Sequence, residues 1–150
     1  MSKIQIMLAI VLVLTIVALF LPWLNATTVV GGERVATINR GYDYIVPLAP
    51  YTAPVAVLCV IGLVLSAYSF KAETKVRKLN VIAGVLIIVG VIAAFAYTTA
   101  AAMGAARGGL GGSINVSGSY GMGLTILFGF LMIIFGALAK PRPSWEQHDR

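Results

Sequence analysis

Charged residues are scarce in this sequence, and four long stretches contain none. Only 11% of the 150 residues are charged and 59% are hydrophobic, and the mean hydropathy is +0.95. A soluble domain has about 25% charged residues, so the composition excludes an ordinary water-soluble protein. Charged residues inside membrane spans usually mark ion paths, proton relays or substrate sites. Their absence argues against a proton-coupled exporter.

Cysteine and histidine are almost absent, since the chain has only Cys59 and His148. A quinone-linked disulfide enzyme needs a cysteine pair and a haem bundle needs histidine ligands within its helices, so both classes are excluded. Cys59 is interpreted as a small packing residue and His148 as a solvated residue of the tail. Glu73 is alone in its loop and has no second ligand at metal-binding spacing. The sequence therefore predicts no enzyme, no cofactor and no metal.

What is present is a set of four apolar runs, each long enough to cross a bilayer as a helix. About 20 apolar residues cover ~30 Å of hydrocarbon, whereas a membrane β-barrel would need alternating runs of about 10 residues. The runs are Ile4–Leu24, Tyr51–Phe70, Asn80–Met103 and Tyr120–Ala139. The sequence predicts an all-α membrane protein, a single-domain four-helix transmembrane bundle. The first run could be a signal peptide, but it exceeds the ~7–15 apolar residues of such a core, so we expect an anchor.

Basic residues are distributed unequally between the two sides of these spans. Eight lie on one side and three on the other: Lys3, Lys71, Lys75, Arg77, Lys78, Lys140, Arg142 and Arg150 against Arg34, Arg40 and Arg107. Because cytoplasmic loops accumulate lysine and arginine, we expect a multi-pass protein of the cell membrane with both termini cytoplasmic. The inner loop 71–79 and the tail 140–150 would then meet anionic lipid headgroups. This orientation also explains the net charge of +6, so no nucleic-acid partner is predicted.

The outer loops, 25–50 and 104–119, carry strand signals. β-Branched residues flank Gly31 and Gly32, which supply the positive φ of a tight turn, so residues 27–38 are predicted to form a β-hairpin. Residues 42–46 could form another strand, and the alternating segment 113–117 one more. A hairpin alone is marginal in water, whereas three or more strands resting on a helix bundle are stable. We therefore expect a small extracellular β-sheet.

Two Asn-x-Ser/Thr sequons fall on this outer side, Asn25-Ala26-Thr27 and Asn115-Val116-Ser117. Glycan acceptors must face outward, so both sequons agree with the predicted topology. Asn25 is expected to lie too near the membrane for modification.

Small residues recur at helical spacing in the last three spans. Helices in lipid approach closely at such positions, because no hydrophobic force distinguishes leucine from the surrounding lipid. The predicted packing residues are Gly62 and Ser66 in the second span, Ala83, Gly90 and Ala94 in the third, and Gly121, Thr125, Gly129 and Gly136 in the fourth. The alternative is that glycine and alanine are simply common in membrane helices.

Specificity for a partner is expected in the outer loops, because the spans offer only apolar surface. Tyr42 and Tyr44 are the predicted contact residues, since exposed tyrosines provide large contact areas at low entropic cost. Arg34 and Arg40 are the neighbouring charges. Alternatively, the tyrosines only pack on the sheet or anchor it at the headgroups.

Four spans with inner termini, a strand-bearing first outer loop and a second loop that adds a strand resemble the claudin-type tetraspan layout. The resemblance covers the whole chain but not the motifs: the claudin first loop carries Gly-Leu-Trp and two cysteines, and this one has only Trp23 at its start. The chain also resembles small four-span proteins of bacteria and archaea through Pro22-Trp23 and Gly121–Leu124. These resemblances imply an adhesion, barrier or scaffold role without catalysis.

The leading hypothesis is a non-enzymatic membrane protein that acts in lateral assembly or adhesion, or as a structural or accessory subunit of a membrane complex. Its partners would be the lipid bilayer and itself or other membrane proteins. The alternative is a subunit of an oligomeric channel or transporter, because a pore can form between subunits without charged spans. Thr98, Thr99, Thr125 and Ser66 could then provide a polar lining.

Overall fold

The described parts of the chain form four helices and a small antiparallel sheet. The computed structural model describes residues 3–30, 33–40, 53–71, 75–107 and 113–139. The elements are α1 (Lys3–Ala18), β1 (Pro22–Val30), β2 (Glu33–Arg40), α2 (Ala53–Ser69), α3 (Val76–Arg107), β3 (Ser113–Gly118) and α4 (Tyr120–Leu138). The prediction of a mainly helical protein that carries a small sheet is confirmed.

Among the described residues, two helices are long and apolar enough to cross a membrane. They are Val76–Ala100 within α3 and Tyr120–Leu138, which is α4. The apolar helices Lys3–Ala18 and Val57–Ser69 are shorter. Helices of full spanning length therefore account for two of the four predicted spans.

The first helix ends sooner than the predicted span because of Pro22. Proline has no backbone N–H and disfavours helical geometry in the residue before it. After Ala18 the chain makes one tighter turn, in which the Leu21 N–H donates to the Ala18 carbonyl oxygen at 3.2 Å. Strand β1 then begins at Pro22. Residues 22–24, predicted to end a helix, belong to the sheet.

Three strands form the sheet, in the order β2-β1-β3. The predicted hairpin is present, with Val30 of β1 opposite Glu33 of β2. All six residues of β3, which lies in the predicted second outer loop, pair with the other edge of β1. The strand predicted at 42–46 lies outside the described residues. The sheet thus joins two loops that are distant in sequence.

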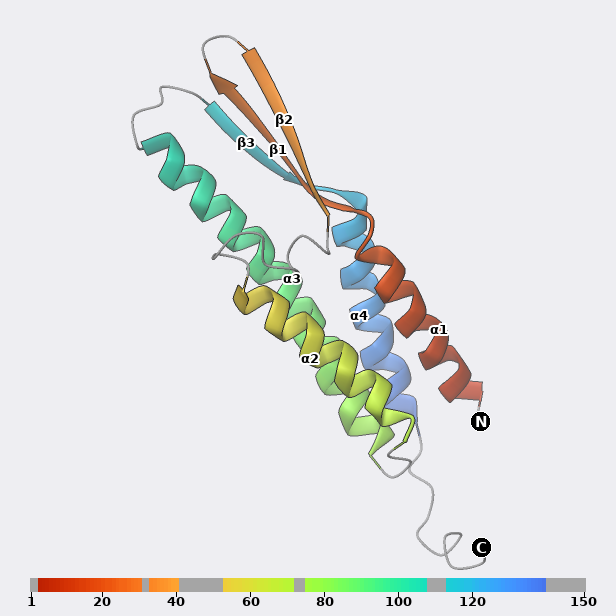
Figure 1. Ribbon diagram of the computed structural model, residues 1–150. Helices are drawn as coiled ribbons and strands as arrows, with labels where there is room; N and C mark the ends of the chain where they lie inside the picture. Colours follow the sequence, from red (N-terminus) through yellow and green to blue (C-terminus); the bar gives the residue numbers. More distant parts are fainter. Residues whose placement is uncertain (1–2, 31–32, 41–52, 72–74, 108–112, 140–150) are drawn as a thin grey trace, which may run out of the picture.

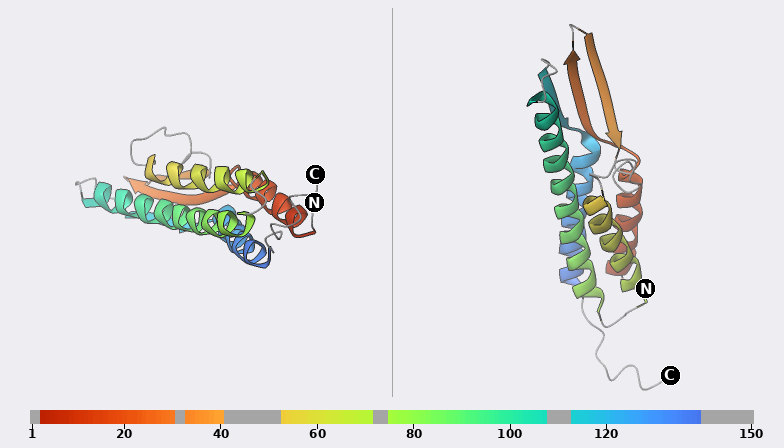
Figure 2. Two further views of the ribbon diagram at one scale, coloured as in Figure 1. Left: turned by 90° about the horizontal axis from the view of Figure 1, so that it is seen from below. Right: turned by 60° about the vertical axis from the view of Figure 1, so that its left-hand side comes forward.

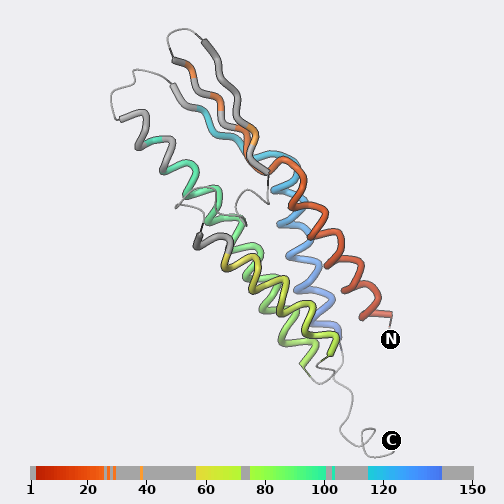
Figure 3. Tube along the Cα trace, viewed as in Figure 1, coloured from red at the N-terminus to blue at the C-terminus, as the bar shows by residue number. Residues whose placement is uncertain are grey.

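Helix α3 packs against both α2 and α4, while α1 packs mainly against α4 (Figure 1). The strands rise from one end of the bundle and continue its long axis (Figure 2). The start of α1 and the end of α4 lie at the opposite end. The 32 residues of α3 span about 48 Å at 1.5 Å per residue. The helix extends past the start of α2 and runs beside β3 (Figure 3).

Three buried hydrophobic clusters are stacked along the bundle. The cluster nearest the sheet contains Trp23. The middle cluster joins three helices through Val11, Ile87 and Met132, and the cluster at the far end contains Leu8. Each cluster combines residues of several elements, so the four helices and the base of the sheet share one continuous core.

The helix surfaces that face away from this core are apolar as well. Val13 of α1, Val64 of α2, Ile92 of α3 and Phe130 of α4 each expose more than half of their surface. A helix that is apolar on all sides is typical of the interior of a large protein or of a membrane.

Candidate functional site

Helices α3 and α4 meet at two glycines, Gly84 and Gly129. A Cβ atom at Gly84 would lie 2.5 Å from the Gly129 carbonyl oxygen, and one at Gly129 would lie 2.7 Å from Cγ1 of Ile88. These distances leave no room for a side chain at Gly84. The two backbones are therefore in direct contact, a geometry that is common at small-residue interfaces between membrane helices.

The predicted packing residues of α4 lie along one buried face of that helix. A Cβ atom at Gly121 would overlap the Pro22 carbonyl oxygen, so this glycine admits the connection from α1 to β1. A Cβ atom at Gly136 would lie 3.0 Å from Cβ of Asn80, at the start of α3. Between them, Thr125 is fully buried and donates to the Gly121 carbonyl oxygen at 2.8 Å. One face of α4 thus contacts two different parts of the chain.

A second face of α3 packs against α2 through Gly62, Ala83 and Gly90. A Cβ atom at Gly62 would lie 3.0 Å from the Ala83 carbonyl oxygen, and one at Gly90 would lie 2.8 Å from Sγ of Cys59. Helix α3 therefore has two packed faces. The spacing pattern in the sequence selected the face toward α2 and missed Gly84, which lies on the face toward α4.

The structure buries all nine predicted packing residues, which are Gly62, Ser66, Ala83, Gly90, Ala94, Gly121, Thr125, Gly129 and Gly136. The glycines among them contact neighbouring elements of the same chain. These small-residue seams are therefore occupied within one copy of the protein and are not open to a second copy.

A polar cluster fastens the end of α2 to the start of α3. Asn80 is fully buried; its Oδ1 accepts from Ser66 Oγ at 2.9 Å, and its Nδ2 donates to Ser69 Oγ at 2.7 Å and to the Val76 carbonyl oxygen at 2.9 Å. Ser69 Oγ donates to the Ser66 carbonyl oxygen at 2.6 Å. The sequence pattern found Ser66 but missed Asn80 and Ser69. Asn80 could have been noticed in the sequence, because it is the amide residue with which the apolar run Asn80–Met103 begins.

We expect Asn80→Ala to lower the free energy of unfolding by about 1–3 kcal/mol, because the buried Ser66 hydroxyl loses its acceptor and the Ser69 hydroxyl loses one of its two hydrogen bonds. The triple change Ser66→Ala, Ser69→Ala, Asn80→Leu should restore part of this loss, because replacement of a whole network by apolar groups can be nearly neutral. Thermal unfolding in lipid nanodiscs measures both. Thr99→Ala, which removes a hydroxyl bonded at 2.8 Å within its own helix, is the control. Equal effects of Asn80→Ala and Thr99→Ala on the free energy of unfolding would contradict the proposed role of Asn80 in joining α2 to α3.

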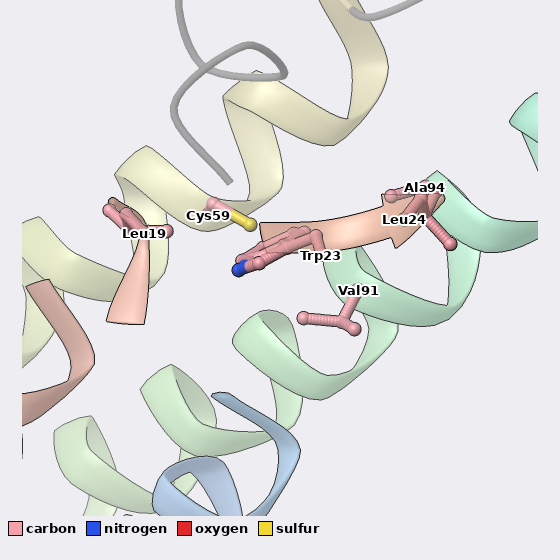
Figure 4. Close-up of a cluster of buried hydrophobic side chains, with 6 residues drawn as sticks. All are labelled: Leu19, Trp23, Leu24, Cys59, Val91 and Ala94. Carbon is pink, nitrogen blue, oxygen red and sulfur yellow. The ribbon is translucent and has the colours of Figure 1, made fainter. Parts of the chain in front are cut away.

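Trp23 joins the sheet to the helix bundle. Its side chain is fully buried, and Nε1 donates to the Ala18 carbonyl oxygen at 3.1 Å. Figure 4 shows the indole between Cys59 of α2 and Val91 of α3. The cluster consists of Leu19, Trp23, Leu24, Cys59, Val91 and Ala94. These residues come from the turn after α1 and from β1, α2 and α3. Since Ala18 is the last residue of α1, this one side chain links the base of the sheet to three helices.

Of the four predicted outer-face residues, the structure places the two arginines apart along one strand. Arg34 and Arg40 lie at opposite ends of β2, opposite Val29 and Pro22 of β1. They are six positions apart, about 20 Å along the strand. Tyr42 and Tyr44 lie outside the described residues.

Comparison with protein-family models, with curated proteins and with solved structures finds no match to this chain. No relative therefore supplies a function, and any proposal must rest on the residues themselves.

The polar and metal-binding side chains of the described residues bear on whether the chain could hold a ligand. No group of three or more His, Cys, Asp or Glu residues that could hold a metal occurs in the part of the chain that the structure describes. In the same part, every buried side-chain nitrogen and oxygen has a hydrogen-bond partner. The glycine seams, the Asn80 cluster and Trp23 together hold a small sheet at one end of an apolar bundle.

Proposed function

We propose that this protein crosses the membrane four times and presents its sheet on the outer side for association with a membrane protein, either a second copy or another subunit. It acts in adhesion, lateral assembly or as an accessory subunit, without catalysis, as the claudin-type layout implies. The observation that carries the proposal is the fixed attachment of the sheet to the bundle through Trp23.

The lengths of the two shorter helices are compatible with spanning. Helix α1 has 16 residues, about 24 Å, and the tight turn at 19–21 adds roughly 6 Å. Helix α2 has 17 residues, about 26 Å. Hydrocarbon cores are ~27–33 Å thick and adjust to small mismatches at modest cost. Apolar residues exposed on all four helices then face lipid rather than water.

The charges support an outer position for the sheet. The bases exposed at the end of the bundle opposite the sheet are Lys3, Lys71, Lys75, Arg77 and Lys78. The positive-inside rule places that end, with both termini, in the cytoplasm. The same bases lie where they can meet anionic lipid headgroups, each worth about 1 kcal/mol near such a surface.

Association would use the sheet, because the glycine seams are filled within one copy. Strand β2 is at the edge of the described sheet, away from β3. Ile38 of β2 exposes 60% of its surface. An exposed edge strand is a template for pairing with another chain. Tyr42 and Tyr44, which follow β2 in the sequence, remain predicted contributors.

A channel or transporter subunit is the alternative function. In the described residues the proposed lining hydroxyls donate within the chain: Thr98 to the Ala94 carbonyl oxygen at 2.9 Å and Thr125 to the Gly121 carbonyl oxygen at 2.8 Å. Few hydroxyl groups are therefore left to line a polar path through one copy, and a pore would have to form between copies.

We expect Ile38→Asp to reduce recovery of the native oligomer or partner by about tenfold or more, the equivalent of ~1.4 kcal/mol, because a carboxylate would enter an apolar contact. Chemical crosslinking in native membranes followed by mass spectrometry measures the recovery. Ile38→Val is the matched control and should retain association. Solute flux in liposomes tests the alternative: flux that Ile38→Asp leaves unchanged, together with unchanged association, would favour the channel.

A further inference from the structure

The two sequons lie side by side in the sheet. The antiparallel register of β1 and β3 places Asn25 opposite Ser117 and Thr27 opposite Asn115. Side chains along a strand alternate between the two faces. All four sequon side chains therefore share one face of the sheet.

This face points away from the helix bundle. Leu24, which precedes Asn25, is fully buried, and Val116, between the two sequon positions of β3, packs against the Trp23 cluster. The opposite face, with the sequons, is therefore directed outward. Asn115 and Ser117 are exposed on it, whereas Asn25 is half-buried.

The two asparagines also differ in their strands. Asn25 lies on β1, the central strand, which is paired on both edges, and follows Trp23 by two residues. Asn115 lies on β3, which has six residues and, among the described strands, pairs with β1 alone. A short edge strand separates from its sheet more readily than a central strand, because fewer hydrogen bonds must break. An enzyme that modifies an asparagine side chain would therefore reach Asn115 more readily than Asn25.

We propose that Asn115 carries an N-linked glycan and that Asn25 does not. The proposal rests on the outer position of the sheet given under Proposed function. The donor is a lipid-linked oligosaccharide, supplied with its membrane transferase on the outer side. The amide nitrogen of Asn115 attacks C1 of the first sugar, and a C1–N bond forms while the C1–O bond to the lipid phosphate breaks. The phosphate leaves with that electron pair, the amide loses one proton to a base of the transferase, and nothing is oxidised or reduced.

A glycan at this position would cover the outward face of the sheet at β3 and the adjacent part of β1. The backbone edge of β2, two strand spacings or about 10 Å from β3, would remain open to pairing with a protein partner. The glycan would thus direct association to the β2 side of the described sheet, where Ile38 is exposed.

The test is the mass of the full-length protein purified from its native membranes, with glycopeptide mapping. We expect one glycan at Asn115. Asn115→Gln and Ser117→Ala should each remove the added mass, whereas Ser117→Thr, which preserves the sequon, and Asn25→Gln should retain it. An unmodified native protein, or a glycan on Asn25, would overturn the proposal.

A second measurement separates the two proposals. Ile38→Cys in a Cys59→Ala background is treated in intact cells with a membrane-impermeant maleimide. Outside labelling of Ile38→Cys without a glycan on Asn115 would refute the glycan alone. Labelling only after the cells are opened would refute the outer position of the sheet, and the glycan proposal with it.

Discussion

Gly84→Leu is expected to leave little folded protein, because α3 and α4 cannot meet with a side chain between them. The Cβ atom alone would lie 2.5 Å from the Gly129 carbonyl oxygen and 2.7 Å from Cγ1 of Ile133. A backbone oxygen cannot rotate away as a side chain can, so the helices must separate. Overpacking typically costs ~1–3 kcal/mol and occasionally more. Folded yield and thermal unfolding in nanodiscs measure the effect.

Gly123→Leu is the matched control, because a Cβ atom at Gly123 of α4 has nothing within 4 Å. It should leave stability unchanged or slightly higher, since glycine within a helix costs about 0.5–1 kcal/mol relative to alanine. A graded series of alanine substitutions should follow the same order: Gly84→Ala most destabilising, Gly129→Ala less so, Gly123→Ala least. At Gly129 the nearest atom belongs to the Ile88 side chain, which can move. Similar effects at Gly84 and Gly123 would show that α3 and α4 do not meet at these glycines.

Trp23→Ala is expected to detach the base of the sheet from the bundle. Truncation of a buried tryptophan costs ~3–5 kcal/mol, which corresponds to a fall of roughly 6–20 °C in melting temperature for a chain of this size. It also removes the bond from Nε1 to the Ala18 carbonyl oxygen. Because Cys59 is buried in the same cluster, its thiol should react with maleimide much faster in the variant than in the native protein.

Two controls accompany this measurement. Phe130→Ala removes an aromatic ring that is 52% exposed on α4 and should change neither stability nor Cys59 reactivity appreciably. Trp23→Phe keeps a ring but loses the hydrogen bond, so it should cost about 1 kcal/mol. Unchanged Cys59 reactivity in Trp23→Ala would mean that the indole does not shield the thiol.

Short sequence patterns predict two parts of the sheet, the hairpin and strand β3. The Gly31-Gly32 pair located the hairpin, and the alternation at 113–117 located β3. The sequence places the end of the first span at Leu24, beyond the end of α1 at Ala18, because hydropathy continues through residues 22–24 into the strand. The end of the predicted span follows from where the apolar residues end. The end of the helix itself follows from the backbone restrictions that Pro22 imposes.

Contacts between helices were harder to predict than the helices themselves. A repeat of small residues identifies one face of a helix, and α3 has two packed faces, so Gly84 fell outside the pattern. The hydrogen bonds of Asn80 depend on which residues of α2 lie beside it, and spacing within one helix carries no such information. Helix α3 is also longer than the predicted span Asn80–Met103, since it begins at Val76 and continues to Arg107.

The position of β3 has a consequence for the order in which the chain assembles. Strand β2 follows β1 immediately, but more than 80 residues, with two helices among them, separate Val30 from Ser113. At ~5–20 residues per second, a ribosome needs roughly 4–16 s to reach the missing strand. During that interval one edge of β1 is unpaired and open to wrong partners. The arrival of β3 closes that edge only after α2 and α3 have been synthesised, so the sheet is completed later than the hairpin that begins it.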